Sequence, residues 1–216
     1  MAFNYSPKVV TDGLVLYLDA ANPNSYVSGS TTWRDISRGG SNGTLVNGPT
    51  YSSANGGSIV FDGVDDGLTL SSALPDLPTF TVEIVFNPSA YQYMQFTLGS
   101  VDFKWRISGQ TPYWNFWTSG GSPQSTTMGV VPPINTVSSF VASYDGNNRR
   151  VGFNGNYLNS TSGTFTPRYP SSNIVGSTSF EEIYGSLYSI KVYNRALSAT
   201  EVLQNYNATK TRFGLI

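Results

Sequence analysis

Apolar and polar side chains alternate over short runs along most of this chain, and that alternation restricts the fold more than any other feature. In residues 80–86 (FTVEIVF), Phe80, Val82, Ile84 and Phe86 would share one face of a strand. Thr81, Glu83 and Val85 would share the other face, because successive side chains of a strand point to opposite sides. The pattern predicts a strand with one face in a hydrophobic core.

Similar short runs recur, and Gly, Pro, Asn or Asp separates them. The further predicted strands are residues 14–18, 59–61, 68–70, 96–98, 103–107, 114–117, 138–144, 149–153, 157–158 and 187–193. This succession of short strands and turn residues is typical of a β-sandwich or β-barrel. A single all-β domain can reach about 200–250 residues, so we expect one domain over residues 1–216, folded as an antiparallel two-sheet jelly-roll sandwich.

Two connections carry turn signals. Asn154-Gly155 predicts a two-residue hairpin turn, because both central residues of a type I′ turn need positive φ. Residues 62–67 (DGVDDG) are also rich in turn formers, and we expect them to pair residues 59–61 with residues 68–70. Residues 22–57 form a long loop region, for which Trp33 is the expected anchor.

One short helix is expected at the C-terminal end. Ser198 and Glu201 have the spacing of a capping box. Val202, Leu203 and Tyr206 would give the helix an apolar side. Residues 1–11 and 209–216 are expected to be peripheral arms.

Composition excludes several functions. Charged residues make up 12% of the chain and the net charge is −1, without the basic stripe that nucleic-acid binding requires. No apolar run approaches the 18 or so residues of a membrane span. Cysteine and histidine are both absent, which removes thiolate metal sites and the commonest general base.

Four segments resemble a known family and come in its order. They are SIVFDGVDDGLTL (58–70), TFTVEIVFNP (79–88), FVASYDGNNRRVGFNGNYL (140–158) and YGSLYSIKVYNRALSATEVLQNYN (184–207). They are similar to laminin-G-like jelly-roll domains of the concanavalin A-like lectin/glucanase superfamily. The resemblance runs from about Leu14 to Tyr206 and implies two stacked antiparallel sheets.

The two ends, residues 12–26 and 203–215, resemble versions encoded by tailed bacteriophages. That resemblance implies a virion protein made in the host cytoplasm, where cysteine is often absent. The first residues, MAFNYSPKVV, also lack the pattern of a secretory signal.

Two departures from the family bear on a metal site. Many relatives carry a Trp-His-His-like segment where this chain has Val137 to Phe140, and an acidic residue where it has Tyr188. Calcium needs six to eight oxygen ligands. Asp62, Asp65 and Asp66 in one turn, and Asp145 in another, therefore favour turn-stabilising roles, and we expect no cofactor.

Catalysis is not expected. Glycoside hydrolysis needs two carboxyl groups across the scissile bond, and Glu83 stands alone in its strand. Glu181 and Glu182 are adjacent and would point to opposite faces. We interpret these acids as solvated surface groups.

An aromatic face is the leading candidate for a binding site. In the run 113–117 (YWNFW), Trp114 and Phe116 would point one way and Tyr113 and Trp117 the other. One set would fill the core, and the other would stack on a sugar or pack on a partner. The candidate ligand-binding residues are Tyr113, Trp117, Trp105, Lys104 and Arg106.

The expected function is non-enzymatic: a virion structural protein such as a head decoration, head fibre or tail-associated adhesion module. Its expected partners are other virion proteins, copies of itself and surface polysaccharide. Phe213, Leu215 and Ile216 form an apolar end that we expect to make assembly contacts. A free carbohydrate-binding module is the alternative, and a glycoside hydrolase is a third.

Overall fold

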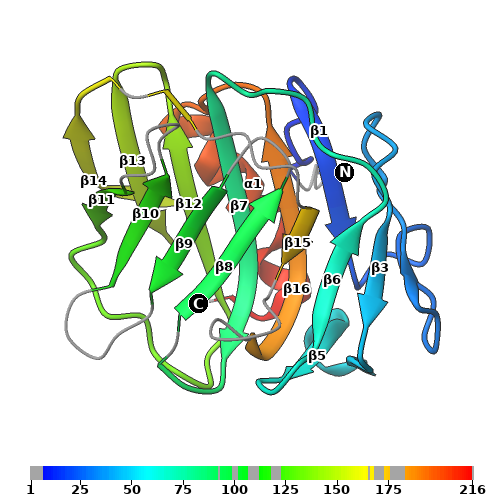
Figure 1. Cartoon of the computed structure of the whole chain (residues 1–216). Coiled ribbons are helices and arrows are strands. Elements are labelled where there is room, and N and C mark those ends of the chain that lie inside the picture. The colour runs from blue at the N-terminus through cyan, green and yellow to red at the C-terminus, as the bar shows by residue number, and fades with distance from the viewer. Residues whose placement is uncertain are drawn as a thin grey trace, which may run out of the picture.

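The predicted all-β sandwich is confirmed by a computed structural model of the chain (Figure 1). The structure describes residues 7–91, 93–98, 102–106, 112–117, 123–164, 166–167, 173–175 and 183–215. For residues 93–98, 102–106, 117, 173 and 174 it describes the backbone alone. Two antiparallel sheets of eight strands each stack face to face, and one α-helix packs behind them.

Sheet A is the sheet next to the helix. Its strands in spatial order are β14 (Asn156–Ser162), β13 (Asn148–Phe153), β12 (Ser138–Tyr144), β7 (Phe80–Pro88), β16 (Tyr184–Tyr193), β5 (Ser58–Asp62) and β4 (Thr50–Ser52), with β1 (Leu14–Asp19) also paired to β16.

Sheet B is the other layer. Its strands in spatial order are β11 (Pro123–Thr127), β10 (Tyr113–Trp117), β9 (Asp102–Arg106), β8 (Tyr93–Leu98), β15 (Asn173–Val175), β6 (Gly67–Leu70), β3 (Gly43–Val46) and β2 (Thr32–Trp33).

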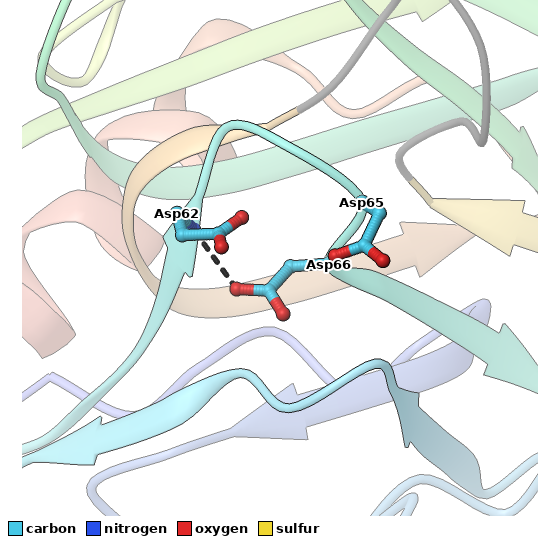
Figure 2. A group of neighbouring side chains, drawn as sticks. All are labelled: Asp62, Asp65 and Asp66. Atoms are coloured by element: carbon cyan, nitrogen blue, oxygen red, sulfur yellow. Dashed lines mark hydrogen bonds between the residues drawn. The ribbon is translucent and has the colours of Figure 1, made fainter.

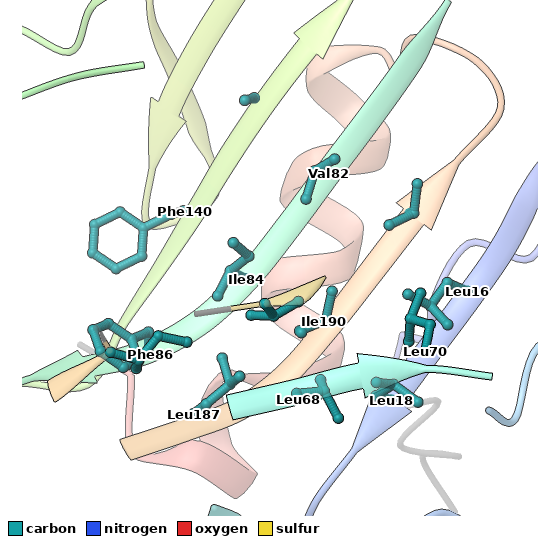
Figure 3. Packing of buried hydrophobic residues seen from close by; sticks show 14 of the residues in the cluster. Leu16, Leu18, Leu68, Leu70, Val82, Ile84, Phe86, Phe140, Leu187 and Ile190 are labelled. Atoms are coloured by element: carbon teal, nitrogen blue, oxygen red, sulfur yellow. The ribbon is translucent and has the colours of Figure 1, made fainter. Parts of the chain in front are cut away.

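The core lies between the inner faces of the two sheets (Figure 3). Phe80, Val82, Ile84 and Phe86 on β7 all point into it, as the alternation predicts. Both faces of β7 are buried, however, because the helix covers the outer face of sheet A. The anchor predicted for the long loop is also confirmed, since Trp33 is fully buried against Tyr26.

The two predicted turns differ in outcome. Asn154 and Gly155 have φ of 45° and 82°, and they join the paired strands β13 and β14 as expected. The pairing of residues 59–61 with residues 68–70 is wrong. β5 belongs to sheet A and β6 to sheet B, so the turn between them carries the chain from one layer to the other.

The C-terminal helix is longer than the sequence predicts. Helix α1 (Ala199–Phe213) begins with the expected capping box of Ser198 and Glu201 and ends at Gly214, whose φ is 67°. Its buried side chains are Val202, Asn205, Thr209 and Phe213, whereas Leu203 is exposed. No helix in the described ranges is long and apolar enough to cross a membrane.

Residues 209–215 are therefore not a peripheral arm, and the expectation for them is wrong. Phe213 and Leu215 lie in a cluster with Val85, Val137 and Tyr188 on the outer face of sheet A. The Phe213 and Tyr188 rings meet edge to face at 5.4 Å. Their partners are in this chain, so neither side chain is free for assembly contacts, while Ile216 lies outside the described residues.

Candidate binding site

The outer face of sheet B is the candidate binding surface. Helix α1 covers sheet A, and among the described residues no helix lies over sheet B (Figure 1). On β10, Trp114 and Phe116 are buried in the core, while Tyr113 and Asn115 are half-buried on the opposite side. The predicted division of the YWNFW run into a core set and an outer set is confirmed for Tyr113, Trp114 and Phe116, while the Trp117 side chain lies outside the described ones.

Strand register extends this surface across sheet B. Directly opposed residues of antiparallel strands share a face. One outer row consists of Tyr93, Arg106, Tyr113 and Thr127, each opposite the next on neighbouring strands. The other consists of Gln95, Lys104, Asn115 and Ser125. Trp105 instead pairs with Trp114, so its register position belongs to the inner row. The side chains of Lys104, Trp105, Arg106 and Trp117 lie outside the described ones, and their predicted roles remain predictions.

The described side chains of this face are uncharged and mostly polar. Ser125 Oγ lies 2.6 Å from Asn115 Oδ1, which places a hydroxyl and an amide side by side on neighbouring strands. Further along sheet B the outer row consists of Thr32, Thr44 and Thr69, which are directly opposed in register. Hydroxyl and amide groups beside a tyrosine suit a ligand that both stacks and exchanges hydrogen bonds.

A second polar cluster lies in the turn between β5 and β6 (Figure 2). One carboxylate oxygen from each of Asp62, Asp65 and Asp66 lies within 4.8 Å of the others, a set that could hold a divalent cation. Two of the carboxylates also accept hydrogen bonds from backbone N–H groups of this turn. Asp66 Oδ2 accepts from the Asp62 backbone at 2.9 Å, and Asp62 Oδ1 accepts from the Val64 backbone at 2.8 Å.

Burial, followed by the charges of Asp62 and Asp65, raises the pKa of Asp66. Asp145 is not part of this cluster. It accepts hydrogen bonds from the backbone of Asn147 and Asn148 and pairs with Arg150 at 2.6 Å, which is a turn-stabilising role.

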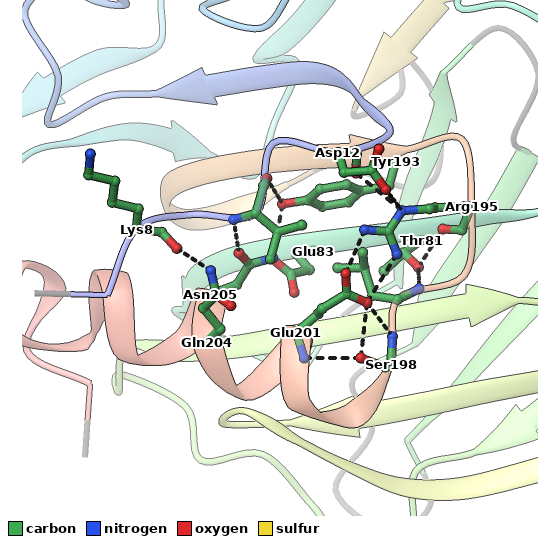
Figure 4. A network of polar contacts seen from close by, with 12 residues as sticks. Lys8, Asp12, Thr81, Glu83, Tyr193, Arg195, Ser198, Glu201, Gln204 and Asn205 are labelled. Carbon is green, nitrogen blue, oxygen red and sulfur yellow. Dashed lines mark hydrogen bonds and ion pairs between the residues drawn. The ribbon is translucent and has the colours of Figure 1, made fainter.

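Glu83 is not a solvated surface acid, and that interpretation is wrong. It is buried under helix α1, where Asn205 Nδ2 donates to its Oε2 at 2.9 Å (Figure 4). Lys191 Nζ lies 3.3 Å from the same oxygen. Desolvation raises the pKa of Glu83, while Lys191 and Asn205 lower it. Glu83, the acid considered above for glycoside hydrolysis, is therefore enclosed in the fold and engaged by Lys191 and Asn205.

Sequence reasoning missed a cavity at one edge of the sandwich. It lies where β3 of sheet B approaches β4 of sheet A, and Tyr26 and Tyr51 are among its lining residues. These tyrosines are 25 positions apart inside the long loop region, so no local pattern links them.

Comparisons with known proteins support the fold. No curated protein matches the chain in sequence. Among solved structures, the chain is similar to domain 4 of AbnA, a GH43 extracellular arabinanase from Geobacillus stearothermophilus, solved in complex with arabinotriose. The TM-score is 0.68 at 14% identity, covering 91% of this chain and all of that domain.

Two toxin domains are similar as well. The binding domain of Paraclostridial Mosquitocidal Protein 1 matches with a TM-score of 0.70 at 13% identity, covering 91% of this chain and 52% of that one. The Botulinum neurotoxin serotype G binding domain matches with a TM-score of 0.68 at 16% identity, covering 89% and 50%. The chain therefore spans about half of each toxin domain.

A family model matches residues 62–203, which is well over half of the chain and includes the whole of β6, β7, β10 and β16. The chain belongs to the concanavalin A-like lectin/glucanases superfamily.

Proposed function

We propose that this domain is a non-enzymatic carbohydrate-binding module that uses the outer face of sheet B. The observation that carries the proposal is the arrangement on β10, where Tyr113 and Asn115 face outward while Trp114 and Phe116 fill the core. Strand β10 thus presents an aromatic ring and an amide on a surface that no helix of the described residues covers.

The chemistry of that face favours a sugar. A tyrosine ring can stack on the apolar side of a sugar ring, and amide and hydroxyl groups can exchange hydrogen bonds with its hydroxyls. The positions of Lys104 and Arg106 in the two outer rows would add positive charge for an acidic polysaccharide. Structurally similar domains include one solved with arabinotriose and two binding domains of toxins.

The placement of the acids supports binding over hydrolysis. Glu83 is enclosed under α1, and Glu201 is held by Arg195 and Ser198 at the start of the helix. Asp19 is fully buried and paired with Arg212. None of these three acids lies on the outer face of sheet B, where the proposed ligand would bind.

We further propose that the module is carried on the virion of a tailed bacteriophage, as a head decoration, head fibre or tail-associated adhesion domain. The support is the sequence resemblance of residues 12–26 and 203–215 and the low charge of the chain. In that setting the outer face of sheet B would meet host-surface glycan. Identification of the chain in purified particles by mass spectrometry tests this location.

A glycan array tests the binding function. We expect bound glycans whose signal is lost in Tyr113→Ala and in Trp117→Ala and kept in Tyr184→Ala, a matched exposed tyrosine at the start of β16 on sheet A. Asp76→Ala, at an exposed position, controls for surface charge. Binding that survives both aromatic substitutions, or turnover of β-glucan by the wild-type chain, would contradict the proposal.

A further inference from the structure

A cavity of about 360 Å³ opens at the edge of the sandwich where β3 of sheet B meets β4 of sheet A. It lies at the opposite end of sheet B from β10 and β11, on the side of β3 in Figure 1. Its lining comes from Tyr26, from residues 28–31, from Leu45, and from residues 48–51. A volume of this size fits a small ligand.

The walls of the cavity combine aromatic rings with hydroxyl groups. The rings of Tyr26 and Tyr51 lie 5.4 Å apart, with 31° between their planes. Ser28, Thr31 and Thr50, which carry hydroxyl groups, are among the lining residues and are exposed. Their side chains make no hydrogen bond to any other residue in the described part of the chain.

The walls are already held in place. Tyr26 OH donates to the Ser30 carbonyl at 2.9 Å, and the Ser30 backbone N–H donates to the Val27 carbonyl at 3.0 Å. The Leu45 N–H donates to the Thr31 carbonyl at 2.8 Å, which fixes this loop on β3. Tyr26 also packs on the buried Trp33. Preformed walls reduce the ordering cost of binding.

No residue that lines this cavity is charged. A larger cavity, of about 580 Å³, lies elsewhere and includes Asp12 and Arg38 in its lining. A phosphate, a carboxylate or an ammonium ligand would find no counter-charge among the residues that line this cavity, and a purely apolar ligand would not use the hydrogen-bonding capacity of Ser28, Thr31 and Thr50.

We propose that this cavity, here named the Tyr26–Tyr51 cavity, is a second carbohydrate site that takes a neutral sugar residue. The ring of Tyr51 packs against the apolar face of the sugar, and Ser28, Thr31 and Thr50 exchange hydrogen bonds with its hydroxyls. The site is independent of the proposed outer-face site, because it lies at the other end of sheet B.

The test uses the full ¹⁵N-labelled chain and follows backbone amide shifts during titration with arabinotriose, xylotriose, cellotriose and maltotriose. Sialyllactose serves as the charged comparison. We expect at least one neutral trisaccharide to shift amides in residues 26–31 and 48–51. Tyr51→Ala should weaken that binding by about tenfold or more, and Tyr51→Phe should retain it.

Two further variants avoid the core. Ser28→Ala and Thr50→Val alter exposed side chains and should each weaken binding about 3- to 10-fold, the usual value of one hydrogen bond. Tyr113→Ala should leave the shifts in this cavity unchanged, which separates this proposal from the outer-face site.

Three outcomes would overturn the proposal. They are shifts confined to β10 and β11, no shift in residues 26–31 or 48–51 with any neutral trisaccharide, and shifts there that depend on protein concentration without sugar. The last outcome would identify a second copy of the chain as the occupant.

Discussion

Lys191 and Glu83 lie on the neighbouring strands β16 and β7 and form an ion pair whose side chains are 2% and 5% exposed. Asn205 of helix α1 donates to the same Glu83 oxygen and also contacts Tyr193 OH at 2.9 Å. Tyr193 OH donates to the Val10 carbonyl, and the Val10 N–H donates to Asn205 Oδ1. One polar network therefore joins the helix, the sheet and the N-terminal segment (Figure 4).

Lys191→Met should destabilise the fold by about 3–5 kcal/mol at neutral pH, because it leaves Glu83 buried without a counter-charge. Burial already raises the pKa of Glu83, and loss of Lys191 raises that pKa further. A carboxyl whose pKa is raised on folding stabilises the fold below its unfolded pKa, and this contribution is lost as pH rises through the folded pKa. The penalty should therefore be smaller near pH 4 than at pH 8.

Urea unfolding of Lys191→Met at the two pH values measures this difference. Lys210→Met is the matched control, since Lys210 is exposed on α1, and its cost should stay within about 0.5 kcal/mol. A penalty for Lys191→Met that is independent of pH would show that Glu83 is not the group left uncompensated.

Asn205→Ala should lower the free energy of unfolding by about 1–3 kcal/mol for each buried polar group that it leaves unpaired. The Val10 N–H is one of these groups. Hydrogen exchange of the Val10 amide should accelerate together with the loss of stability. Gln204→Ala is the control, because Gln204 is exposed and donates a single hydrogen bond to the Lys8 carbonyl. Unchanged exchange at Val10 in Asn205→Ala would contradict the role given to this network.

The sequence predicts strands well but not their partners. Alternation identifies β7 and the two faces of β10, because the side-chain period of a strand is a local property. The same local pattern cannot tell a hairpin from a crossing between layers, so β5 and β6 are wrongly paired. Both arrangements need only turn residues such as Asp62 and Gly63, and the choice depends on partners far along the chain, including β16 for β5.

The helix illustrates a second limit. Its start is predictable from Ser198 and Glu201, but the apolar pattern gives only two turns. The later turns bury Asn205 and Thr209, whose polar groups are satisfied by the network described above or by the helix backbone. Apolar periodicity cannot detect a buried polar face. The Tyr26–Tyr51 cavity was missed because its walls come from loop residues brought together by the two sheets.

Phe213→Ala should destabilise the fold by about 3–5 kcal/mol, the usual cost of removing a buried phenylalanine. Deletion of residues 209–216 should cost more, because it also removes the ion pair at 2.6 Å between Arg212 and the buried Asp19. Thermal unfolding measures both effects. Leu203→Ala is the control at an exposed position of the same helix. A deletion variant with the wild-type melting temperature would contradict this stabilising role and would favour the assembly contacts predicted from the sequence.

Glu201→Gln should lower stability by about 1 kcal/mol at pH 7 and have little effect near pH 2. Gln can still complete the capping box with Ser198, so the substitution removes chiefly the ion pair with Arg195, whose Nη2 lies 2.6 Å from Glu201 Oε1. Arg195, followed by the hydrogen bonds of Ser198, lowers the pKa of Glu201 to about 2. An acid whose pKa falls on folding stabilises the fold above its unfolded pKa, and this contribution is lost as pH falls through the folded pKa.

The melting temperatures of wild type and variant should therefore converge between about pH 4.5 and pH 2, whereas the difference for Asp76→Asn, at an exposed position, should stay small throughout. If the melting temperature of wild type still exceeds that of Glu201→Gln by the same amount at pH 2, the charge of Glu201 does not stabilise the start of helix α1.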